Sequence, residues 1–184
     1  MKRLLLVLIV MLISAVAVFA NGDGEEGAET TALEGYSNAM DSSLKFDLQW
    51  KIEGENLMVQ MAAPTTGWLS VGFDAEDKMA GANILIGYVE DGTVMLRDDY
   101  GSGAVKHEAD SALGGSDDFS DVSGSEADGT TIISFTIPLN SGDSNDKPLE
   151  AGKAYKVIYA YGPNGKDDFG SYHTKSRGTF EITL

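Results

Sequence analysis

The chain has 184 residues, no cysteine and a formal net charge of −16 at pH 7. Its length suits one domain with a core of its own, and the lack of cysteine excludes stabilising disulfides. So acidic a chain is not expected to bind nucleic acid, because nucleic acid requires a cationic surface.

The first twenty residues have the pattern of a signal peptide. Two basic residues precede an apolar run over residues 4–19, which ends in the small-x-small pattern Val18-Phe19-Ala20. This run is shorter than the roughly 20 residues that a membrane-spanning helix needs. We therefore expect residues 1–20 to be cleaved after export, to the periplasm or to the extracellular space, with no membrane insertion of the mature chain.

Residues 21–42 are rich in Gly, Glu, Ala and Thr and contain few large apolar side chains. Such a segment cannot repay the entropy lost on ordering. We expect a flexible acidic leader here, followed by a single folded domain over residues 43–184.

The domain has the pattern of short strands separated by turns. Apolar residues alternate in the first two segments, and an Asp-Gly turn at 91–92 predicts a hairpin. The expected strands are residues 44–52, 56–62, 67–73, 83–89, 93–99, 130–138, 155–161 and 178–184. This pattern predicts an all-β fold, an antiparallel two-sheet β-sandwich of the immunoglobulin-like kind with eight to eleven strands. Residues 101–128 and 163–177 are expected to be long connections, which are often functional.

Two residues stand out as candidate ligands. Met58, Met61 and Met95 lie within strand patterns and should be packed, whereas Met79 lies in a loop between an acidic run and a small-residue run. His173 ends the second long connection. A thioether and an imidazole on opposite faces of a porphyrin give a six-coordinate haem iron suited to electron transfer.

Three blocks carry a family resemblance. They are Gly67–Phe73, Met79–Tyr88 and Tyr172–Gly178, and they occur in this order. Together they resemble a DOMON domain, and the pattern is most similar to the haem b cytochrome domain of cellobiose dehydrogenase and related exported cytochromes. The resemblance covers nearly all of residues 43–184.

The resemblance implies a sandwich that holds haem b without covalent bonds, with Met79 and His173 as axial ligands of the iron. Expected neighbours of the haem, chosen by their nearness in sequence to the ligands, are Trp68, Phe73, Ile86, Tyr88, Tyr172 and Arg177, the last beside a propionate. We expect the two ligand loops to gather at one end of the sandwich. The implied role is that of a single-electron carrier between separate redox partner proteins, which a basic docking face would suit, and not that of an enzyme.

Other functions stay open at this stage. A carbohydrate-binding sandwich without haem would use aromatic residues such as Trp50, Trp68, Tyr88 and Tyr100. Acidic loops at 143–146 and 167–168 are compatible with calcium but contain no complete EF-hand. No hydrolase, zinc-protease or phosphate-binding motif is present in the sequence. In a purely structural protein Met79 would lie in the core and His173 on the surface.

Overall fold

The computed structural model describes residues 28–29 and 33–184. The predicted signal peptide lies outside these residues, as do residues 21–27 and 30–32 of the predicted leader. No helix in the described part of the chain is long and apolar enough to cross a membrane.

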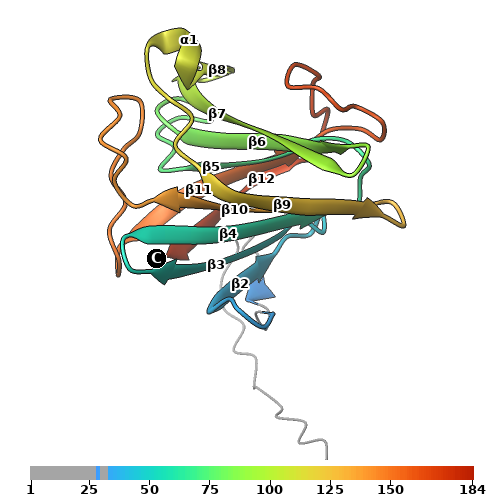
Figure 1. Cartoon of the computed structure of the whole chain (residues 1–184), viewed down its shortest axis with the longest axis horizontal. Coiled ribbons are helices and arrows are strands. Elements are labelled where there is room, and N and C mark those ends of the chain that lie inside the picture. Colours follow the sequence, from blue (N-terminus) through green and yellow to red (C-terminus); the bar gives the residue numbers. More distant parts are fainter. Residues whose placement is uncertain (1–27, 30–32) are drawn as a thin grey trace, which may run out of the picture.

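The chain folds into two antiparallel sheets that pack face to face (Figure 1). One sheet has the order β1 (Ala28–Glu29), β2 (Asn38–Asp41), β3 (Asp47–Glu53), β4 (Asn56–Ala63), β10 (Thr130–Pro138) and β9 (Ser120–Ala127). The other, here called sheet B, has the order β12 (Arg177–Thr183), β11 (Ala154–Tyr161), β5 (Leu69–Phe73), β6 (Asn83–Glu90), β7 (Thr93–Gly103) and β8 (Lys106–Ala109). The predicted all-β sandwich is therefore confirmed.

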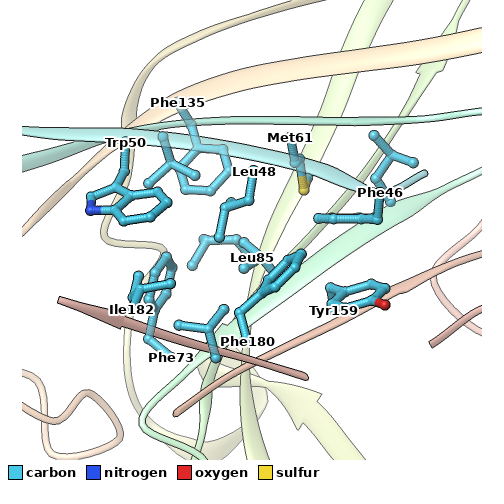
Figure 2. Close-up of a cluster of buried hydrophobic side chains, with 14 of the residues drawn as sticks. Phe46, Leu48, Trp50, Met61, Phe73, Leu85, Phe135, Tyr159, Phe180 and Ile182 are labelled. Carbon is cyan, nitrogen blue, oxygen red and sulfur yellow. The ribbon is translucent and has the colours of Figure 1, made fainter. Parts of the chain in front are cut away.

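The core lies between the sheets and follows from strand alternation. Phe46, Leu48 and Trp50 point inward from the segment around β3, as the sequence predicts, and each is at most 4% exposed. Sheet B contributes Phe73, Leu85, Tyr159, Phe180 and Ile182 from the other side, and Figure 2 shows these two groups facing each other. Such close interdigitation of apolar side chains is the main source of stability in a domain without disulfides.

The structure corrects three expectations about the elements. Residues 38–41 form β2, which pairs with β3, so the fold begins earlier than residue 43. Residues 101–128 are more than a long connection, because they hold the end of β7, then β8, the short helix α1 (Asp110–Leu113) and β9. Met95 is 42% exposed, although its strand pattern predicted packing.

The outer face of sheet B, which points away from the sandwich core, is also apolar near its centre. Side chains alternate along β5, so Gly72 points outward between the inward-facing Val71 and Phe73. A Cβ atom on Gly72 would lie 2.8 Å from Ile158 and 3.0 Å from Ile84. Ile84 is only 2% exposed despite its outward position. Loops must therefore cover this face.

Candidate functional site

Met79 lies in the loop from β5 to β6, at the edge of the apolar outer face. Its half-buried side chain packs with Ile158 against a small cluster of Ala75, Ala82 and Ile84. The Met79 amide donates a 3.4 Å hydrogen bond to the carbonyl of Ala104. The loop is thus held against sheet B, with a thioether among apolar neighbours.

His173 lies in the long loop from β11 to β12. Its half-buried ring meets Trp68 edge-on, with 6.3 Å between ring centroids, and stacks on Tyr172 at 4.5 Å. Burial lowers the pKa of His173, and the charges of Arg177 and His107 lower it further, although a backbone contact with Thr174 opposes them. The imidazole is therefore neutral at physiological pH, which is the form that coordinates metals.

Arg177 fixes the proton arrangement of that ring. Its Nη1 atom lies 3.3 Å from His173 Nδ1, and a guanidinium can only donate, so Nδ1 is the acceptor and the ring proton is on Nε2. The same Nη1 donates to the Tyr172 hydroxyl at 3.2 Å and to the Thr174 carbonyl at 3.0 Å. Coordination of a metal by His173 therefore requires that Arg177 releases Nδ1. Either Nδ1 then binds the metal, or the proton moves from Nε2 to Nδ1 and Nε2 binds it.

The two ligand loops leave sheet B at opposite ends, which corrects our expectation that they gather at one end. In the β5–β11 register, Phe73 pairs with Val157 at the end next to the Met79 loop, and Leu69 pairs with Tyr161 at the end next to the His173 loop. In Figure 1 the red-orange loop before β12 lies at the far end of sheet B from the green connection between β5 and β6. The two loops can approach each other only over the outer face of the sheet.

Contacts of both loops indicate that they do extend over this face. Met79 packs against the cluster that contains the outward-facing Ile84. Phe169, in the His173 loop, packs on Tyr88 with 5.0 Å between ring centroids and lies under the Arg97 guanidinium at 4.4 Å. The loop before β12 therefore covers part of the outer face of β6 and β7.

The residues predicted to surround the haem divide into those that lie on the outer face of sheet B and those that do not. Trp68 and Ile86 are 3% and 2% exposed, and the indole Nε1 of Trp68 is buried without a hydrogen-bond partner. Tyr88 is half-buried under Phe169. Phe73 belongs instead to the core between the sheets, because inward and outward positions alternate along β5 (Figure 2). Tyr172 is 67% exposed and is not packed on this face.

Sequence reasoning missed a charged network on the same face. Asp99 is fully buried, and its Oδ2 accepts a 2.7 Å hydrogen bond from Arg97 Nη2 and a short bond from His107 Nδ1. Burial raises the pKa of Asp99, but the bonds from His107 and Arg97 outweigh it and hold the pKa below its usual value. The feature of the sequence that could have predicted this network is the charged run Arg97-Asp98-Asp99 within a strand pattern, because charges in a half-buried strand need partners.

A groove of about 280 Å³ lies elsewhere, where β2 and β3 meet β12. It is lined by Ser37, Asn38, Ala39, Met40, Trp50, Glu181, Ile182 and Thr183. Trp50 and Trp68 are only 4% and 3% exposed, so neither presents a ring face on which a sugar could stack.

The fold and the site define an antiparallel β-sandwich that carries a thioether and a neutral imidazole over the outer face of one sheet. The DOMON domain model matches residues 42–162, and the chain belongs to the DOMON family. DBH-like monooxygenase protein 1 of Mus musculus is 30% identical over 146 residues, which are 79% of this chain and 23% of that protein. The Gallus gallus protein of the same name is 28% identical over 164 residues, or 86% of this chain and 25% of its own length. The chain thus spans about a quarter of these relatives.

Two solved structures share the fold. The cytochrome b domain of pyranose dehydrogenase from Coprinopsis cinerea has a TM-score of 0.57 at 12% identity and covers 76% of this chain and 77% of its own. The cytochrome domain of Myriococcum thermophilum cellobiose dehydrogenase has a TM-score of 0.58 at 10% identity, with coverage of 88% and 90%. At such identities the likeness concerns the fold alone.

Proposed function

We propose that this domain binds one haem b without covalent bonds and carries single electrons, with Met79 and His173 as the residues that hold the iron. The observation that carries the proposal is the neutral His173 beside Trp68, together with a thioether from the opposite end of the same apolar face. Two protein ligands leave no open coordination position, so the domain acts as a carrier and not as an enzyme.

The surroundings of the two ligands suit such a cofactor. The outward-facing Ile84, Ile86 and Ile158 offer an apolar floor, and the buried Trp68 Nε1 is a hydrogen-bond donor without a partner. Haem, when bound, supplies a one-electron iron couple whose potential thioether ligation raises. Arg177, which is exposed next to His173, has the charge and the reach to pair with a propionate.

The acidic surface supports a separate redox partner with a basic docking face. A net charge of −16 attracts cationic partners over distances of about one Debye length, roughly 10 Å at 0.1 M salt. Export, which the sequence of residues 1–20 predicts, is part of the proposal. The buried state of Trp50 and Trp68 disfavours the alternative of a sugar-binding module.

The test is the absorption spectrum of the mature chain, purified from an exporting host supplied with haem, before and after reduction with dithionite. We expect a low-spin spectrum with sharp α and β bands in the reduced protein. Met79→Ala and His173→Ala should each convert it to a high-spin form or lose the haem.

Matched controls are Met95→Ala, since Met95 is exposed in β7, and His107→Gln, which changes the other histidine. Both should keep the low-spin spectrum. A chain that stays colourless and takes up no added haemin, although circular dichroism shows it folded, refutes the proposal. Loss of the low-spin bands in His107→Gln with retention in His173→Ala refutes the ligand assignment.

A further inference from the structure

Three aspartates from distant parts of the chain meet near the end of β7. Asp98 comes from β7, Asp110 begins α1, and Asp146 comes from the loop between β10 and β11. Each offers one carboxylate oxygen, and these oxygens lie within 4.8 Å of one another. Asp98 and Asp110 are fully buried. Three acids at this distance repel one another unless protons or a cation neutralise them.

The cluster also has unpartnered buried atoms, which is a second observation. Both carboxylate oxygens of Asp110, one oxygen each of Asp98 and Asp146, and Oδ1 of Asn83 have no hydrogen-bond donor. Within the described residues, none of the ion pairs includes any of the three aspartates. Orphaned buried carboxylates are costly, so a positive ligand is the physical complement that this site lacks.

We propose that Asp98, Asp110 and Asp146, with the side-chain oxygen of Asn83, form a calcium site. The donors are oxygens only, which excludes a zinc preference and suits a hard cation. Calcium takes six to eight oxygens in flexible geometry and accepts ligands from irregular loops, whereas magnesium demands a near-ideal octahedron and retains its water. Asp98 points toward the core side of sheet B, whereas Met79 packs on its outer face, and the test of the calcium site needs no haem.

The loops around the cluster are already arranged by related contacts. Asp143 accepts a 2.8 Å hydrogen bond from the Ser116 amide and another of 2.8 Å from the Asn145 amide. Asp98 Oδ2 accepts a 3.3 Å bond from the Asp118 amide. These bonds bring the loop after α1 and the loop after β10 to the same end of β7. A bound cation would join both loops to sheet B.

The experiment is titration calorimetry of the mature chain, freed of metal with EDTA and dialysed, with CaCl₂ and separately with MgCl₂ at pH 7.5. We expect one saturable calcium site with a Kd at or below about 10⁻³ M, the weak end for extracellular modules. Magnesium should bind at least tenfold more weakly. The melting temperature should rise with calcium concentration, because a ligand of the folded state stabilises it.

Asp110→Asn should weaken calcium binding at least tenfold and remove the calcium-dependent rise in melting temperature. In EDTA this variant should melt at or above the wild-type temperature, because it removes one of three carboxyl groups that lie within 4.8 Å of one another. Asp128→Asn is the matched control, since Asp128 is an exposed aspartate in the β9–β10 turn. If Asp110→Asn fails to fold, Asp146→Asn in the half-buried loop serves instead. The proposal is overturned if calcium at concentrations up to about 10-fold above that Kd gives no saturable binding heat. It is also overturned if Asp110→Asn, or Asp146→Asn in its place, binds calcium with wild-type affinity.

Discussion

Gly101 in β7 provides the sharpest test of how the Met79 loop is held. A Cβ atom at this position would lie 1.7 Å from the Met79 carbonyl oxygen, 2.7 Å from its carbonyl carbon and 3.1 Å from the Ala82 amide nitrogen. All three contacts are to backbone, so no side chain can rotate to make room. In Gly101→Ala the Met79 loop must move by more than 1 Å, since Cβ contacts below 3.0 Å essentially never occur.

The magnitude follows from the hydrogen bonds that hold the two segments together. The Gly81 amide donates to the Gly101 carbonyl at 2.8 Å, and the Gly101 amide donates to the Ala82 carbonyl at 2.9 Å. Each such bond contributes roughly 1 kcal/mol net, and an unpaired buried group costs about 1–3 kcal/mol. Alanine regains about 0.4–1 kcal/mol by restricting the unfolded chain. We expect Gly101→Ala to lower the free energy of unfolding by about 2–4 kcal/mol.

Gly103→Ala is the matched control on the same strand. Its Cβ would meet only Lys106 Cβ, at 3.9 Å, and neither glycine has a positive φ. Urea unfolding followed by tryptophan fluorescence should place Gly103→Ala within about 0.5 kcal/mol of wild type. Gly101→Ala should also bind haem more weakly if Met79 is a ligand. Equal stability of the two variants would show that the Met79 loop does not depend on this close approach.

Two further predictions concern the buried aspartates. Burial and neighbouring carboxylates raise the pKa of Asp98 to about 8 and that of Asp110 to about 7. Without calcium the folded chain holds protons that the unfolded chain releases, so stability in EDTA should fall as pH rises from about 4 to 8 and then level off. Urea unfolding at several pH values across this range measures how steeply the free energy of unfolding falls with pH. This dependence should be shallower in Asp98→Asn, and a wild-type stability that does not change with pH would contradict the prediction. Asp99→Asn should cost roughly 3 kcal/mol in thermal or urea unfolding, because Arg97 loses its buried partner; a loss under about 0.5 kcal/mol would mean that the pair is not buried in solution.

The strands that could be predicted are those whose two faces differ. Phe46, Leu48 and Trp50 alternate with polar residues, because only one face of this strand packs against the opposite sheet. The strand β9 has no such signal. Its sequence from Ser120 to Ala127 is largely exposed, and it forms by backbone pairing with β10 at the sheet edge. An edge strand exposed on both faces leaves no hydrophobic pattern for sequence analysis to detect.

The candidate ligands were identified by residue type and context, but their arrangement was not predictable. Met79 and His173 are separated by many strands, and only the register shows which end of sheet B each loop leaves. A sequence gives loop order without loop position. Asp98 and Asp99 are adjacent in sequence and both fully buried, and the sequence likewise does not show where in the fold each of them lies.

The two aspartates show how one strand serves both proposed sites. Asp98 pairs in register with Leu85, a core residue, so it points toward the sandwich interior, where it meets Asp110. Asp99 pairs with the outward-facing Ile84 and therefore lies on the opposite face, under Arg97 and His107. Gly101, two residues further on, hydrogen-bonds to the backbone of the Met79 loop. A cation that fixes the end of β7 would thus also fix the strand against which Met79 is held, which is a physical reason for both sites to occur in the same domain.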